Sequence, residues 1–213
     1  MAYIFPLLLF VIVAACIGFL YPEGMWSNAV RFINVVLAMM LATSFFEPVA
    51  RLIEKQAESV SFFVDFLALW LVFILSVMIL NQITRAVSEV KVRFLKIADN
   101  IGSGVFATLI GYLMVCFTVL SIHVAPLGRT AFWDGFDPMQ PTFVGMRPEF
   151  QWLGFFQHAS NGVFCTYPPN VFDPSGQWVN TYTLRRDKVA SHAASTGTFK
   201  VNSASEAGPE AKR

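Results

Sequence analysis

Long apolar runs separated by short polar segments make up most of the first 127 residues. The runs cover residues 3–21, 29–46, 60–80 and 101–125. A helix of about 20 apolar residues crosses the roughly 30 Å hydrocarbon core of a bilayer. These runs also lack the polar face that a helix in a soluble bundle presents to water. The pattern therefore predicts an all-α membrane protein with four transmembrane helices in residues 1–127.

The polar segments between these runs have a helical pattern of their own. In residues 81–100, apolar side chains recur at steps of three and four, and the basic residues Arg85, Lys91, Arg93 and Lys96 occupy the rest of the helix surface. Such a basic amphipathic helix is typical of contact with anionic lipids. The alternative is that the third helix continues into water with its apolar stripe packed on the bundle. Residues 47–59 form a second candidate for an amphipathic connecting helix.

The chain after residue 127 has a different character. Residues 128–190 are rich in Pro, Gly, Asn and Asp but also in aromatic residues, which predicts a loop-rich extension outside the membrane. Within it we expect a short helix over residues 150–156 and a turn at Asp173-Pro174-Ser175-Gly176. Alternating residues from Trp178 to Leu184 predict a short strand. Residues 191–213 are expected to form a disordered tail.

Composition agrees with a membrane protein and excludes other classes. Hydrophobic residues make up 55% and charged residues 14% of the 213-residue chain, and the mean hydropathy is +0.57. Soluble domains carry about 45–50% apolar and about 25% charged residues. The net charge of +1 argues against nucleic-acid binding, which requires a marked basic excess. The lipid bilayer is thus the expected partner.

Basic residues near the helix ends predict the orientation, because cytoplasmic loops carry the excess of Lys and Arg. One side of the membrane would hold five of them and the other side three. The first set is Arg31, Arg85, Lys91, Arg93 and Lys96, and the second is Arg51, Lys55 and Arg129. This places the loop between the third and fourth helices in the cytoplasm. Both termini are then expected outside it.

The first apolar run has alternative interpretations. It lacks the basic residues that begin a secretory signal. Val13-Ala14-Ala15-Cys16, however, resembles the cleavage site of a bacterial lipoprotein, which would make Cys16 a lipidation site. We favour Cys16 as an apolar residue of a transmembrane helix and keep lipidation as the alternative.

Glycine placement adds a family resemblance to this pattern. The fourth run begins in the segment Phe94-Leu95-Lys96-Ile97-Ala98-Asp99-Asn100-Ile101-Gly102-Ser103-Gly104, and Gly111 follows. The first run ends with Gly18-Phe19-Leu20-Tyr21, and Gly24 comes before the apolar stretch 34–46. Over residues 3–127 the chain resembles the colicin V production protein (CvpA) family of bacterial inner-membrane proteins. The resemblance implies four membrane helices and a role in toxin production or export, or in envelope homeostasis. It implies nothing for the extension.

Small residues on the fourth helix form the first candidate site. Ser103, Ala107 and Gly111 recur every four residues and so form one ridge. Small residues let membrane helices approach closely. We expect this ridge to make helix four either the hub of the bundle or the contact of a homo-oligomer.

Two ionisable residues within the apolar runs form the second candidate site. Asp65 lies early in the third helix and His123 late in the fourth, so both lie toward the same side of the membrane. Such residues often mark ion or proton paths, and the pair would suit a small transporter or channel. The alternative is that each simply reaches water from its helix end. On the other side, Asp99 and Arg31 are expected to form an interfacial ion pair.

Motifs for catalysis or for metal binding are lacking. The chain has no G-x-S-x-G motif and no phosphate-binding glycine loop, and its His and Cys residues lack the paired spacing of a zinc site. Asp134 and Asp137 lack the repeated ligands of a calcium loop. Cys165 and His158 remain the one candidate for a nucleophile and base. We therefore expect that the protein is not an enzyme and binds no cofactor or metal. The preferred interpretation is a membrane component whose extension binds an envelope protein. The alternatives are a transporter using Asp65 and His123, or an anchor for an enzymatic partner.

Overall fold

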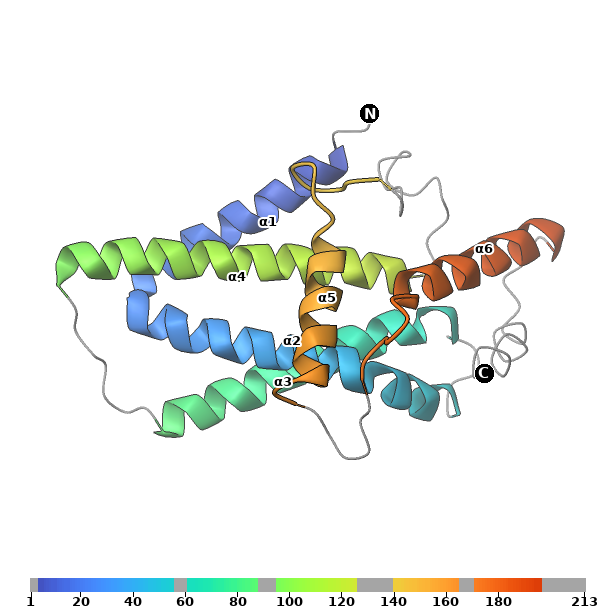
Figure 1. Ribbon diagram of the computed structural model, residues 1–213, viewed down its shortest axis with the longest axis horizontal. Coiled ribbons are helices and arrows are strands. Elements are labelled where there is room, and N and C mark those ends of the chain that lie inside the picture. The colour runs from blue at the N-terminus through green and yellow to red at the C-terminus, as the bar shows by residue number, and fades with distance from the viewer. Residues whose placement is uncertain (1–3, 56–60, 88–94, 126–139, 165–170, 197–213) are drawn as a thin grey trace.

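The computed structural model describes residues 4–55, 61–87, 95–125, 140–164 and 171–196, and these residues are almost entirely helical (Figure 1). The elements are α1 (Ile4–Leu20), the 3-10 helix η1 (Tyr21–Glu23), α2 (Met25–Glu54), α3 (Ser61–Val87), α4 (Lys96–Val124), α5 (Pro148–Asn161) and α6 (Trp178–Thr196). Four of the helices, α1 to α4, are long and apolar enough to cross a membrane. This confirms the predicted all-α membrane fold with four spanning helices.

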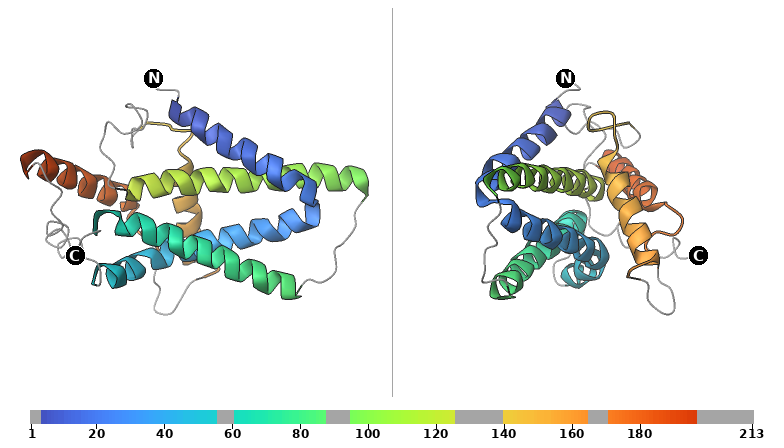
Figure 2. Two further views of the ribbon diagram at one scale, coloured as in Figure 1. Left: turned by 180° about the vertical axis from the view of Figure 1, so that it is seen from behind. Right: turned by 60° about the vertical axis from the view of Figure 1, so that its left-hand side comes forward.

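The four long helices lie side by side, with α4 and α2 at the centre. α1 packs on α4, α4 on α2, and α2 on α3, as the two views of Figure 2 also show. The core accordingly lies along α2 and α4, with the large side chains Met39, Phe46, Phe117 and Leu120 fully buried. α1 and α3 flank this pair and present exposed apolar side chains such as Leu7 and Leu71. Exposed apolar surface on a spanning helix suits lipid contact.

The spanning helices are longer than their apolar runs. α2 continues past residue 46 to Glu54 with Pro48 inside the helix, and α3 continues to Val87. Hydropathy marks the part of a helix that lies in hydrocarbon, whereas the helix itself ends where its backbone pairing ends. Residues 47–54 and 81–87 are therefore continuations of α2 and α3 rather than separate amphipathic helices. Residues 56–60, Lys91 and Arg93 lie outside the described residues.

The extension contains two helices, and one of them replaces the predicted strand. Residues 150–156 lie within α5 as expected, but α6 covers the segment predicted as a strand. Trp178, Val179 and Tyr182 are buried together, and their spacing of one and four is that of a helix face. The prediction of disorder is also wrong for residues 191–196, which belong to α6.

The predicted turn before α6 is confirmed and prepares the start of that helix. The Gly176 backbone N–H donates to the Asp173 carbonyl at 3.1 Å. The Asp173 carboxylate accepts from the backbone N–H groups of Gln177 and Trp178, both at 2.9 Å. A carboxylate in this position satisfies free N–H groups at a helix start. This local capping favours a helix over a strand for the residues that follow.

Candidate functional site

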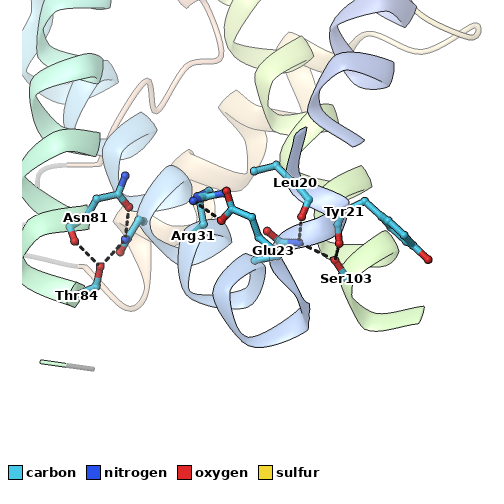
Figure 3. A network of polar contacts seen from close by, with 9 residues as sticks. Leu20, Tyr21, Glu23, Arg31, Asn81, Thr84 and Ser103 are labelled. Atoms are coloured by element: carbon cyan, nitrogen blue, oxygen red, sulfur yellow. Dashed lines mark hydrogen bonds and ion pairs between the residues drawn. The ribbon is translucent and has the colours of Figure 1, made fainter. Parts of the chain in front are cut away.

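A polar network joins three helices at the start of α4 (Figure 3). Asn28 of α2 is fully buried, and its Nδ2 donates to the Leu20 carbonyl at 2.8 Å and to Ser103 Oγ at 2.9 Å. Ser103 Oγ donates in turn to the Tyr21 carbonyl at 2.7 Å. The carbonyls at the end of α1 have no partner within their own helix. Ser103 and Asn28 supply these partners and so fix the end of α1 against α2 and α4.

The small-residue ridge on α4 faces α1 of the same chain. Ser103, Ala107 and Gly111 are all buried. A Cβ placed on Gly111 would lie 3.2 Å from Val13 Cα and 3.3 Å from Cys16 Cβ, so the two helices touch almost backbone to backbone there. The ridge is therefore covered within the chain, and any contact between copies of the chain needs another surface.

The expected ion pair between Arg31 and Asp99 is replaced by two other contacts. Arg31 Nη2 lies 2.6 Å from Glu23 Oε2 (Figure 3). Asp99 Oδ1 accepts from the backbone N–H of Met25, the first residue of α2, at 2.9 Å. A carboxylate at a helix N-terminus is favoured by the helix dipole. The prediction of this pair is wrong because each residue finds a partner nearer in the fold.

A second polar contact, which the sequence did not indicate, joins α2 to α3. Asn34 Nδ2 donates to Asn81 Oδ1 at 2.9 Å and to Thr84 Oγ1 at 3.0 Å (Figure 3). Asn34 is buried. Polar groups removed from water require such bonds. The membrane helices are thus held together by hydrogen bonds as well as by apolar packing.

Asp65 and His123 do not pair with each other but with residues of the extension. Asp65 Oδ2 accepts from Arg185 Nη1 of α6 at 3.3 Å. His123 is 1% exposed, and its Nε2 lies 3.7 Å from Glu149 Oε1 of α5. The sequence identified both ionisable residues, but their partners lie far away along the chain. Asp65 and His123 therefore make two separate contacts with the extension in place of the predicted contact with each other.

Glu149 is the centre of a buried polar cluster between α4 and α5. Its side chain is fully buried, and Arg147 Nε lies 3.6 Å from the same Oε1 that faces His123. Nearby, the Tyr112 hydroxyl of α4 donates to the Gln151 carbonyl oxygen of α5. A buried carboxylate needs a positive or hydrogen-bonding partner. Arg147 provides the positive charge, and His123 faces the same carboxylate oxygen. Nothing in the sequence pattern singled out Glu149.

α6 contacts the ends of α2 and α3 through an acidic pair of residues, Glu47 and Asp65. Tyr182 donates its hydroxyl to Glu47 Oε1 at 3.0 Å, and its ring packs against Phe46 and Trp178. Burial, reinforced by the nearby Glu47 carboxylate, raises the pKa of Tyr182 well above its ordinary value. The phenol therefore remains protonated and can donate. Arg185 completes the contact through Asp65.

The remaining candidates for catalysis and lipidation gain little from the structure. His158 is exposed on α5, while Cys165, Asp134 and Asp137 lie outside the described residues. Among the residues that are described, no three His, Cys, Asp or Glu side chains are grouped closely enough to hold a metal ion. Cys16 lies inside α1 and packs against Gly111. Arg85 and Lys96 are both exposed at the opposite end of the bundle from α6.

A comparison with known families matches most of the chain. A family model described as "Colicin V production protein" matches residues 5–135, which is more than half of the chain. This range runs from the second residue of α1 through the other spanning helices and ends before α5 and α6. No curated protein and no solved structure matches the chain.

Proposed function

Because the chain belongs to the colicin V production protein family, we propose that this multi-pass membrane protein is a non-enzymatic component of the bacterial inner membrane. It supports the production or export of a secreted toxin, or the homeostasis of the envelope. α6 serves in this proposal as the docking element for an envelope partner. The family match covers the membrane helices, and the role of α6 is argued from its contacts.

The observation that supports the proposal is that polar side chains join the helices to one another by hydrogen bonds and ion pairs. Asn28 and Ser103 fix α1 to α2 and α4, and Asn34 fixes α2 to α3. Asp65 and Glu47 hold α6. Polar groups in membrane helices serve either transport or assembly. Bonds that tie helix to helix support assembly, and α6 extends from one end of the bundle with Leu184 exposed (Figure 1).

Truncation after residue 177 tests the docking role while leaving α5 on the bundle. In cells that export a toxin, we expect the truncated chain to reach the membrane but to lose its crosslinks to the envelope partner and to reduce toxin secretion. Lys188→Ala, an exposed change within α6, is the control for the full chain. Undiminished partner crosslinks and undiminished secretion in the truncated chain would refute the docking role.

The buried His123 next to Glu149 favours a second candidate function, a small transporter or channel that uses Asp65 and His123. Protonatable groups buried in membrane helices can carry protons. Proton or ion flux is to be measured in vesicles for the wild-type chain, Asp65→Asn and His123→Gln. Flux in the wild-type chain that vanishes in both variants would replace the assembly role with transport.

A further inference from the structure

α5 and the residues that lead into it form one segment that meets the spanning helices deep along their length. The Phe143 ring lies 4.9 Å, between centroids, from Phe10 of α1. Gln151 bonds to Tyr112 of α4, and Trp152 Nε1 donates to Thr43 Oγ1 of α2 at 3.3 Å. These contacts come from three different helices. They therefore fix the depth of the segment independently of one another.

Each of these contacts lies well inside its spanning helix. Phe10 is about 9 Å from the start of α1, and Tyr112 is about 18 Å from the end of α4, at roughly 1.5 Å per residue. Thr43 lies about 6 Å on the membrane side of Glu47, the first charged residue after the apolar run of α2. All three positions fall within the apolar runs that are long enough to cross the bilayer. The contacts thus lie at hydrocarbon depth rather than beyond it.

α5 runs across the bundle, whereas α1 to α4 run along it (Figures 1 and 2). A helix perpendicular to the spanning helices keeps one depth along its whole length. Its inner face, with Trp152, Leu153 and Phe156, is buried against the core. Its outer face carries Phe155, which is 50% exposed, and Phe150. This exposed apolar side continues the exposed apolar surface of the spanning helices.

We propose that α5 and the turn before it lie inside the bilayer, in the plane of the membrane, with Phe150 and Phe155 facing lipid acyl chains. The expectation that all of residues 128–190 lie outside the membrane is then replaced for this helix. The proposal concerns membrane placement and stands apart from the proposed function.

Two polar residues near the start of α5, Glu149 and Gln151, fit this placement because they have partners within the protein. Glu149 is turned onto His123 and Arg147, and the Arg147 guanidinium lies 3.8 Å from the centre of the Phe150 ring. Gln151 is bonded to Tyr112. Charges at membrane depth are tolerated when they are paired or face the protein interior. The exposed side of α5 carries the aromatic residues Phe150 and Phe155 along its first turns, and the exposed His158 and Asn161 lie in its last turn.

The test uses the full chain in vesicles of phosphatidylcholine and phosphatidylglycerol. Part of the phosphatidylcholine carries a diazirine in the middle of one acyl chain. After illumination, we expect lipid adducts on the α5 peptide with Phe150 and Phe155, and on the α3 peptide with Leu71 as the positive control. The α6 peptide contains Leu184, which is about as exposed as Phe155 but lies beyond the bundle, and it should carry no lipid adducts. An unlabelled α5 beside a labelled α3 would overturn the proposal.

A second measurement separates lipid from a second copy of the chain. Phe155→p-benzoylphenylalanine places a photoreactive ring on the outer face of α5, and Leu184→p-benzoylphenylalanine is its matched control. Mass spectrometry of the intact chain should detect lipid adducts in the variant with the photoreactive residue at position 155 and none in the variant with it at position 184. Chain dimers in place of lipid adducts at position 155 would show a protein interface there and overturn the proposal.

Discussion

Gly111 is the residue on which the approach of α1 to α4 depends. A Cβ added at position 111 would lie 3.2 Å from the backbone of Val13, whereas a Cβ added to Gly18 of α1 would meet nothing within 4 Å. Overpacking of a tight contact costs about 1–3 kcal/mol. We therefore expect Gly111→Ala to lower the free energy of unfolding in detergent micelles by about 1 kcal/mol or more.

Gly18→Ala is the matched control for that change, since it adds the same methyl group to a helix glycine with open space around it. It should leave the free energy of unfolding unchanged or raise it slightly, because alanine favours the helix. Equal losses in the two variants would mean that the close contact between α1 and α4 is not what Gly111 provides.

His123 and Glu149 make unequal contributions to their buried contact. Replacing His123 by Leu removes one of the two groups beside the fully buried Glu149 carboxylate, and a buried polar group that loses a partner costs about 1–3 kcal/mol, with more for a charged one. Glu149→Gln removes the charge and keeps the shape, so the expected cost is only about 1 kcal/mol. The double variant should be more stable than His123→Leu. A double-mutant cycle on the free energy of unfolding measures this, and strictly additive losses would contradict the coupling.

The sequence identifies ionisable residues that are costly to place in a membrane, but it does not identify the residues that they contact. Asp65 and His123 are conspicuous because charge is rare in apolar runs. Glu149, however, lies in a polar segment where a carboxylate is ordinary, and only the fold shows that it is buried. Arg31 shows the same limit, since its partner Glu23 comes from the turn that closes α1.

Docking of α6 at the element scale depends more on Tyr182 than on Arg185. Tyr182 is 5% exposed and contacts Phe46 and Trp178, whereas the Arg185–Asp65 pair is partly open to solvent. Removing a buried aromatic side chain costs about 3–5 kcal/mol, and an exposed ion pair is worth about 0–1 kcal/mol. Limited proteolysis should therefore cut α6 readily in Tyr182→Ala and only slightly faster in Arg185→Ala. Equal protection of α6 in both variants would contradict this ranking.

The protonation state of Tyr182 makes the α6 contact sensitive to alkali. Its pKa is raised in the folded chain by burial and by Glu47, so the folded state holds this proton more tightly than the unfolded state. The stabilisation is fully present below the ordinary tyrosine pKa of about 10 and is lost as the pH rises above it. Fluorescence of the tryptophans, including Trp178, should report the release of α6 under alkali. Tyr182→Phe, which has no phenolic proton to lose, should weaken this pH dependence.

The elements of the fold were predictable to different degrees. Membrane helices could be found because hydrocarbon demands long apolar runs, while their ends at Glu54 and Val87 could not, since a helix continues after its apolar run stops. α6 was mistaken for a strand because Trp178 and Tyr182 fit a spacing of two as well as one of four. Burial of Val179 beside Trp178, seen only in the fold, decides between the two.

The whole molecule has two chemically different ends. At one end α6 meets Glu47 and Asp65, and the opposite end, where α3 ends and α4 begins, carries the exposed basic residues Arg85 and Lys96 (Figure 1). At the basic end, hydrogen bonds through Ser103 and Asn34 join the spanning helices to one another. At the acidic end, the extension contacts the spanning helices. α6 is therefore tied to one membrane face, and the orientation decides which partners it meets.

The basic end is expected in the cytoplasm because Lys and Arg near helix ends resist translocation. A reporter that is active only outside the cytoplasm, fused after residue 196, should then be active, and a reporter that is active only in the cytoplasm should be silent. Changing both Arg85 and Lys96 to Glu removes two of the five basic residues on that side and should shift part of the population to the opposite orientation. Changing Arg51 and Lys55 to Glu at the other side is the matched control, which should strengthen the original orientation. Cytoplasmic activity alone in the unaltered chain would reverse the orientation and place α6 among cytoplasmic rather than envelope partners.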